Sequence, residues 1–280
     1  MAAHRTIVDH NGISTDKLQV VVPSVFAQQP YEKTSARYGF VPTIDVVQSL
    51  KATGLNLVQA GQTLTRVEGK SPFTRHVLRF RPQYAPTVMN EALPEVVLMN
   101  SHDGSSGFKL WLGLFRMVCA NGMIVSSGTF SSVSIPHRSN AAEIVAQQSL
   151  DFLSNIETLD EGMRRFKDKH MTETEMYQFA EKAAQIRWGT ERPAGLNARD
   201  LLLARRLQDA HHNLWAVLNT IQENLTKGGV NLNRTGRQST TRGLRSVSDD
   251  VRMNTQLWGA AESFLHGEII DVEAREVEII

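Results

Sequence analysis

The sequence predicts an α+β protein with a mainly antiparallel sheet in the N-terminal half, helices packed on that sheet, and a helical C-terminal half. Short apolar runs bounded by turn residues dominate up to about residue 138, which is the pattern of strands and hairpins. Beyond residue 138, apolar residues recur at spacings of three and four, which indicates amphipathic helices. The length of 280 residues, with 41% hydrophobic and 21% charged side chains, is typical of a globular chain.

The N-terminal half is expected to hold one helix followed by strands. The helix enters at Pro42, with Thr43 as its N-cap, and ends at Gly54. Asn121-Gly122, between two apolar runs, is the strongest hairpin signal in the chain. We expect residues 1–20 to form an N-terminal tail and residues 21–138 a sheet-rich region. The strand candidates are residues 55–59, 64–67, 75–81, 95–100, 110–119, 123–126 and 129–135.

The C-terminal half is expected to hold four helices within residues 139–266. The first is capped by Asn140 and extends toward Phe166, and the second opens with a capping box at Thr172–Glu175 and ends near Gly189. The longest is capped by Asn197, carries a leucine and alanine stripe over 203–225, and ends at Gly228-Gly229. The last covers 248–265 and precedes an acidic tail, 267–280. Both halves are expected to form one cooperative domain.

Composition argues against several classes of protein. The formal charge of +1 gives no global field toward nucleic acid or membrane, so a basic function requires local clustering. A single cysteine, Cys119, excludes an intrachain disulfide and suits a reducing compartment. The N-terminus carries no secretory signal, and the most apolar stretch, residues 110–118, is too short to span a bilayer. We therefore expect a cytoplasmic protein with no membrane partner.

Several ordered motifs resemble a known family. The central ones are NSHDGSSG at 100–107, GLFR at 113–116 and VCANG at 118–122, followed by Leu214-Trp215 and the segment ending at Trp258. Over roughly residues 20–265 the chain resembles the phage- and plasmid-borne family known as domain of unknown function 932, and its relative 945. The resemblance implies carriage on prophages, plasmids or integrative elements. It implies no catalytic residue and no cofactor.

A basic segment without acidic residues is the most informative functional feature. From Lys227 to Arg245 the chain carries five cations among glycine, serine, threonine and asparagine, and the next carboxylate is Asp249. We expect a flexible arm or long loop, whose guanidiniums suit phosphate contacts. The alternative is a solvated loop whose arginines pair with carboxylates. The cations are Lys227, Arg234, Arg237, Arg242 and Arg245.

A second basic feature lies on a candidate strand. Alternation places Arg75, Arg79 and Arg81 on one face, which is suited to following a phosphate backbone. Taken alone, this strand favours the other interpretation, in which its arginines face solvent and protect a sheet edge. Together with the arm, it predicts a groove for nucleic acid.

His102-Asp103 is the segment that most resembles an enzyme site, since both residue types bind metals and transfer protons. However, Asp-Gly flanked by serines is a typical turn sequence, and no recognised metal spacing surrounds it. A turn is therefore the favoured interpretation. No phosphate-binding loop and no nucleophile elbow occur, so we expect neither ATP hydrolysis nor an assigned catalytic residue.

These features predict a mobile-element protein that binds DNA, with single strands preferred, and assists annealing or recombination without ATP. Viral annealing proteins, which form oligomeric rings or filaments from a small sheet, helices and a basic groove, provide an analogy of architecture. The analogy leaves a homo-oligomer open. Two alternatives remain: a module that binds and inhibits a host defence or regulatory protein, and a metal-dependent hydrolase using His102 and Asp103.

Overall fold

The computed structural model describes residues 4–35, 38–84, 91–117, 121–125, 132–135, 140–154, 156–233 and 239–267. The chain divides into two compact units, each described by itself below. Of the described residues, the first contains those up to Ile156 together with Arg245–Ser248, and the second contains Glu157–Leu244 together with Asp249–Gly267. Sequence analysis expected a change of character near residue 138. The division falls later because helix α3 (Ala141–Ser154) packs against the sheet.

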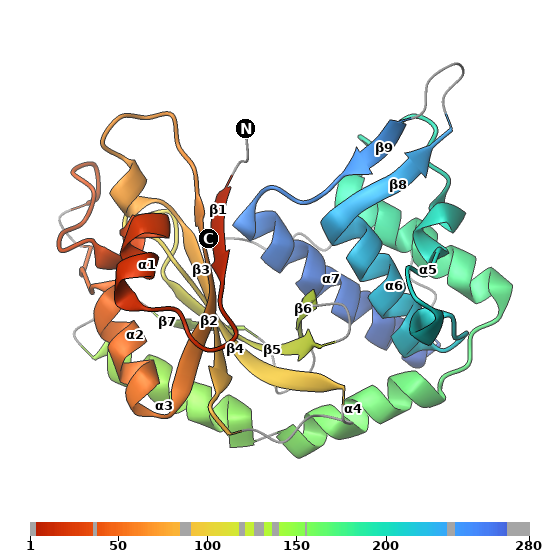
Figure 1. The fold of residues 1–280 in the computed structure, drawn as a ribbon, viewed down its shortest axis with the longest axis horizontal. Coiled ribbons are helices and arrows are strands. Elements are labelled where there is room, and N and C mark those ends of the chain that lie inside the picture. The colour runs from red at the N-terminus through yellow and green to blue at the C-terminus, as the bar shows by residue number, and fades with distance from the viewer. Residues whose placement is uncertain are drawn as a thin grey trace. The chain divides into compact units, whose positions relative to one another are not determined.

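A curled antiparallel sheet is the centre of the first unit (Figure 1). In the described residues its strands are β1 (His4–Val8), β2 (Leu55–Thr63), β3 (His76–Pro82), β4 (Ala92–Asn100), β5 (Phe108–Arg116), β6 (Asn121–Ile124) and β7 (Val133–Ile135). They pair in chain order from β1 to β6, and β7 pairs with the other half of the β5 edge. The prediction of an antiparallel sheet in this half is confirmed.

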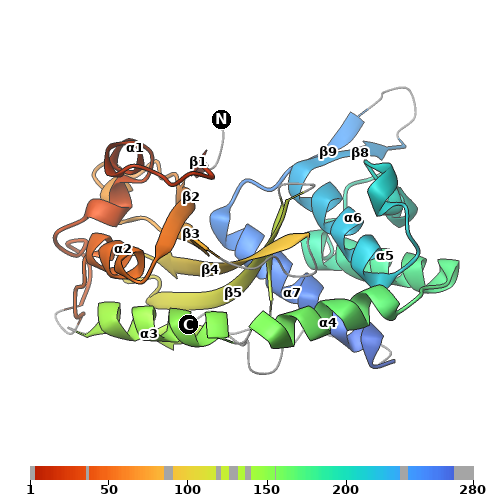
Figure 2. The same cartoon turned by 60° about the horizontal axis from the view of Figure 1, so that its bottom comes forward.

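Helices α1 (Thr15–Val21), α2 (Thr43–Ala52) and α3 lie on the same side of this sheet (Figures 1 and 2). Helix α2 lies between β2 and α3, and α3 also contacts β4 and β5. Apolar side chains face the helices from the sheet, including Leu57, Leu78 and Phe80, each of which is fully buried. Burial of this apolar face holds the layers together.

The structure differs from the expectations for this unit at several points. The segment expected to be a tail contains β1, which pairs with β2, and α1, capped by Ser14. Gly61 lies within β2, and Val247 and Thr6 approach it so closely that a Cβ there would be only 3.1–3.2 Å from them. Residues 64–67, expected to be a strand, form none in the structure.

Helix α2 begins at Thr43 rather than after it. Pro42 is the N-cap, and no side chain caps the helix. The Thr43 hydroxyl is instead used in a buried polar network described below. The β5–β6 hairpin predicted from Asn121-Gly122 is present, although these two residues lie inside β6 and not in its turn.

In the residues that the structure describes, the second unit contains four α-helices and a two-stranded ribbon. The helices are α4 (Ile156–Asp168), α5 (Glu173–Trp188), α6 (Leu214–Lys227) and α7 (Val247–Leu265). Phe179 on α5 meets Phe264 on α7 edge to face, with ring centroids 5.2 Å apart, and Phe166 on α4 lies 5.1 Å from Trp258. The predicted capping box of α5 is confirmed, with Thr172 and Glu175 bonding to each other's backbone N–H.

The longest predicted helix, from Asn197 to Leu225, is wrong in its first half. Asn197 caps only a short 3-10 turn, Ala198–Leu202, and α6 starts afresh at Leu214 with Asn213 as its cap. Residues 169–171 pair with 212–214 through backbone hydrogen bonds, which are incompatible with a continuous helix. Leu203 and Leu207, expected in the apolar stripe, are 61% and 91% exposed. Within the described residues, no helix is long and apolar enough to cross a bilayer.

Candidate nucleic-acid interface and buried arginine cluster

The arginines of the predicted basic strand are mostly buried. Arg79 and Arg81 are 2% and 7% exposed, and both bind Glu95 on the neighbouring strand β4, which is fully buried. Arg79 Nη1 lies 3.0 Å from Glu95 Oε2, and Arg81 Nε lies 2.7 Å from Glu95 Oε1. The alternation predicted for β3 does place both arginines on one face. That face is buried. Arg79 and Arg81 therefore fit neither expectation from the sequence, which placed them either in contact with a phosphate backbone or facing solvent.

Two glycines make room for this ion-pair cluster. A Cβ on Gly122 would lie 2.5 Å from Arg79 Nη1, and a Cβ on Gly113 would lie 3.3 Å from the Cβ of Glu95. The Arg81 guanidinium also lies over Phe115, with its Cζ 3.5 Å from the ring centroid. The cluster is thus enclosed by neighbouring strands and held by charge-assisted hydrogen bonds.

Arg75 is separate from these two residues. It lies just before β3, is half-buried, and donates to Ser248 Oγ at 3.0 Å and to the Ser105 carbonyl at 3.2 Å. The three arginines of the predicted strand therefore form no single exposed row.

The basic segment 227–245, expected to be a flexible arm or loop, contains a two-stranded antiparallel ribbon. Its strands are β8 (Gly228–Leu232) and β9 (Ser239–Arg242). One face is buried through Val230, Leu232 and Thr241. Side chains alternate along each strand, and the other face exposes Asn231, Thr240 and Arg242. Arg234 and Arg237 lie outside the described residues.

Helix α6 leads directly into this ribbon. Gly228 ends the helix at φ 69° and is the first residue of β8, and a Cβ there would collide with the backbone of Arg242 and Gly243. Lys227, the last residue of the helix, binds Glu223 at 2.7 Å. Arg245 is exposed and follows the ribbon in the chain.

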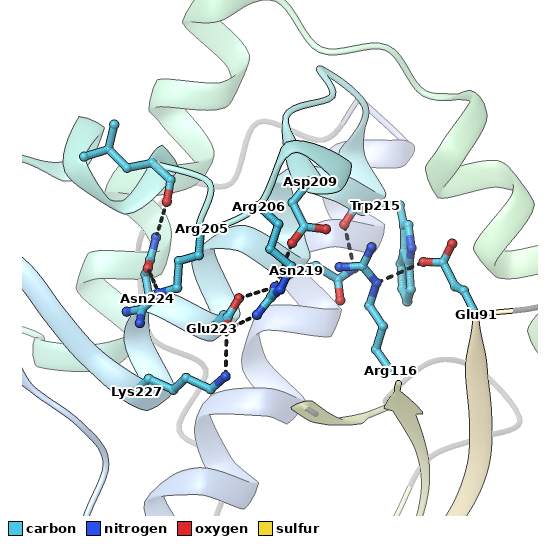
Figure 3. A network of polar contacts seen from close by, with 11 residues as sticks. Glu91, Arg116, Arg205, Arg206, Asp209, Trp215, Asn219, Glu223, Asn224 and Lys227 are labelled. Atoms are coloured by element: carbon cyan, nitrogen blue, oxygen red, sulfur yellow. Dashed lines mark hydrogen bonds and ion pairs between the residues drawn. The ribbon is translucent and has the colours of Figure 1, made fainter. Parts of the chain in front are cut away.

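Glu223, on the last turns of α6 before β8, binds two cations, Arg206 and Lys227 (Figure 3). Arg206 forms a two-pronged contact with the carboxylate, with one N–O distance of 2.7 Å, and also reaches Asp209 at 2.9 Å. Burial alone would raise the pKa of Glu223, but hydrogen bonds from Arg206 and Lys227 outweigh burial and lower it. Arg205 donates to the Asn224 side chain and to the Gly228 carbonyl, so α6 and β8 share one polar network.

The His102-Asp103 pair forms a turn, as the favoured interpretation of the sequence expected. Asp103 accepts from the Ser105 backbone N–H, and Gly104 adopts φ 78°. Asp103 also binds Lys70 at 3.0 Å. Burial alone would raise the pKa of Asp103, but hydrogen bonds from Ser105 and Lys70 prevail and lower it.

The side chain of His102 belongs to a different environment. It is fully buried, and its Nε2 lies 3.0 Å from the Thr43 hydroxyl, which also contacts His76 Nε2 at 3.1 Å. Asn100 donates to the same hydroxyl, and Ser24 contacts His76 Nδ1. In the part of the chain that the structure describes, no group of three or more His, Cys, Asp or Glu side chains is placed to hold a metal ion.

Sequence reasoning missed Glu95 and the buried histidine network. A signal for Glu95 does exist, because it is the one charged residue in the apolar strand ALPEVVLMN, and a carboxylate in such a strand requires a cation nearby. The partner of that carboxylate follows from strand register, which the sequence alone does not supply.

The sheet, the two units and the ion-pair cluster define a mixed α+β protein without an assigned catalytic centre. The chain belongs to the family described as Domain of unknown function (DUF932), whose model matches residues 30–258. It is 33% identical over 254 residues to UPF0380 protein YafZ of Escherichia coli strain K12, which covers 90% of this chain and 92% of that protein. UPF0380 protein YfjQ of the same organism is 32% identical over the same shares. No solved structure matches the chain.

Proposed function

We propose that this protein binds single-stranded nucleic acid through the exposed face of the β8–β9 ribbon and the cations next to it in the chain. We further propose that it supports ATP-independent annealing or recombination of a mobile element. The observation that carries the proposal is the ribbon itself: a segment without a carboxylate between Lys227 and Asp249 presents Asn231, Thr240 and Arg242 on its outer face.

These groups match the chemistry of a phosphate backbone. Guanidinium, amide and hydroxyl groups supply most protein contacts to phosphate and sugar, and these contacts carry no sequence preference. The proposal does not use Arg79 and Arg81, because both are buried against Glu95.

Lys227 has a secondary role in this proposal. Its ammonium binds Glu223, which is buried, while 42% of its side chain remains exposed. Because the carboxylate already balances its charge, we expect Lys227 to contribute less to binding than the exposed Arg242.

The test is fluorescence anisotropy with a labelled single-stranded oligonucleotide and a duplex of matched length over a salt series. The ribbon variant replaces four arginines by alanine, and its matched control removes four exposed cations elsewhere. With about 0.7 counterions released per single-strand phosphate contact, the ribbon variant should lower the salt slope by up to ~3 and weaken binding at low salt. The ribbon variant changes Arg234, Arg237, Arg242 and Arg245, and the control changes Lys17, Lys51, Arg66 and Arg164.

The outcomes are distinct. Salt-dependent binding that the ribbon variant loses and the control keeps supports the proposal, and tighter binding of the single strand supports the preference for single strands. Faster pairing of two complementary labelled strands in the presence of protein and absence of ATP supports annealing. Absence of binding to either form at low salt overturns the proposal, and so does equal loss in both variants.

A further inference from the structure

A pocket of about 450 Å³ opens on the arginine side of the sheet in the first unit. It lies at one end of four neighbouring antiparallel strands, where β2 and β4 begin and β3 and β5 end. Its volume is within the range of small-molecule sites, roughly 300–1,000 Å³. Its lining includes Arg81, His10, Phe115 and Met117.

Arg81 is the most unusual residue of this lining. Its Nε binds Glu95 and its Nη1 donates to His10 Nδ1 at 3.1 Å, whereas its Nη2 is buried and has no hydrogen-bond partner among the described residues. A buried donor without an acceptor is costly, so native proteins rarely retain one without a reason. A ligand oxygen would remove that cost.

The charge of the cluster favours an anion. Two buried guanidiniums, those of Arg79 and Arg81, share the Glu95 carboxylate, and burial strengthens the attraction of a guanidinium for an oxyanion. Guanidinium groups bind phosphate and carboxylate with two parallel hydrogen bonds.

The remaining walls are partly aromatic. The rings of Phe115 and His10 contact each other, with centroids 5.4 Å apart, and so form one aromatic wall against which a flat ring can pack; Met117, 44% exposed, also lines the pocket. Asn56 and Gln83 add amide groups that recognise polar ring edges. Mostly apolar walls with a few polar groups are typical of sites for organic ligands.

We propose that this pocket binds a small organic oxyanion, a phosphate or carboxylate carried by a flat ring, with Arg81 holding the oxyanion. This inference goes beyond the proposed nucleic-acid binding and does not depend on the ribbon. The two chemical sources of such an oxyanion are a nucleotide and an aromatic acid.

The test is isothermal titration calorimetry of the full chain with four probes: a nucleoside 5′-monophosphate, the same nucleoside without phosphate, benzoate, and inorganic phosphate. At least one of the two ringed oxyanions should bind. The nucleoside alone and inorganic phosphate alone should bind about tenfold more weakly or not at all, because each lacks one half of the recognised chemistry. Whether the monophosphate or benzoate binds identifies the source.

Three variants make the test specific. Arg81→Gln removes the oxyanion donor but leaves Arg79 to pair with Glu95, and Met117→Trp fills the pocket without touching the ion pair. Both should reduce affinity by at least about tenfold. Arg66→Gln, an exposed arginine outside the pocket, is the matched control and should bind as the unaltered protein does.

Failure of both ringed oxyanions to bind overturns the proposal. So does equal affinity for the nucleoside and its monophosphate, or unchanged affinity in folded Met117→Trp. If Arg81→Gln does not fold, as judged by circular dichroism, Met117→Trp alone decides. The ribbon variant should bind these probes unchanged, so this proposal and the nucleic-acid proposal fail separately.

Discussion

Glu95 shows how a single residue determines the character of a sheet face. It is fully buried and shared by two guanidiniums, so its removal takes away the carboxylate that both buried cations bind. Desolvating an unpaired charge costs far more than a buried ion pair contributes. Losing the Glu95 carboxylate should therefore destabilise the protein by more than the ion pair itself stabilises it.

We expect Glu95→Gln to destabilise the first unit by about 3–5 kcal/mol, the usual cost of breaking a buried ion pair. Urea unfolding monitored by circular dichroism measures this loss. Glu32→Gln, at an exposed site, is the control and should change stability by less than about 0.5 kcal/mol. A loss below about 1 kcal/mol for Glu95→Gln would show that solvent reaches the cluster.

Gly122 offers a second prediction at the same cluster. A Cβ there would overlap the Arg79 guanidinium, so Gly122→Ala must displace one arm of the ion pair. We expect a loss of about 1–3 kcal/mol by urea unfolding, the usual cost of overpacking a buried site. In Glu95→Gln, where the guanidinium of Arg79 no longer binds a carboxylate at position 95, the same change should cost less, and full additivity of the two losses would contradict the coupling.

At the scale of elements, the sequence predicted those that depend on local chemistry. The α5 capping box and α7 followed from residues within a few positions of one another, whereas the β5–β6 hairpin is present but Asn121-Gly122, expected in its turn, lie in β6. The helix expected from 197 to 225 was wrong because distant backbone groups, at 169–171, pair with 212–214. The burial of Arg79 and Arg81 was missed for the same reason, since Glu95 reaches them only through strand pairing. Whether the ribbon binds nucleic acid stays a prediction.

The α5 cap supplies a prediction in which pH is the variable. Ion pairing with Lys169 and hydrogen bonds from Thr172 lower the pKa of Glu175 to about 2. Because this value is below that of the unfolded chain, near 4.5, the stabilisation is present above pH 4.5 and is lost as the pH falls toward 2. Thr172→Ala should cost about 1 kcal/mol at pH 7.

The measurement for this cap is urea unfolding of both proteins between pH 7 and pH 3. The difference in stability between the unaltered protein and Thr172→Ala should shrink as the pH falls below 4.5, because the unfolded chain then binds a proton at Glu175 that the folded cap, with its pKa of about 2, does not. A difference independent of pH would mean that Glu175 takes no part in the cap.

At the scale of the whole molecule, the chain has two compact units, each with its own buried side chains. Glu95 belongs to the first, and Phe179, which is fully buried against Phe264, belongs to the second. If each unit has its own core, a destabilising substitution should lower the opening free energy of its own unit alone. If the two units share one cooperative core, the same substitution should lower the opening free energy of the whole chain. The sequence favoured a single cooperative domain, so the two expectations differ in a measurable way.

Hydrogen exchange followed by mass spectrometry distinguishes them. Glu95→Gln should accelerate exchange in peptides from β3, β4 and β5 and leave α5 and α6 near their original rates. Phe179→Ala, with a cost of about 3–5 kcal/mol for a buried phenylalanine, should do the reverse. Faster exchange across both units in either variant would show one cooperative structure, because local loss of packing would then lower the free energy of every opening reaction equally.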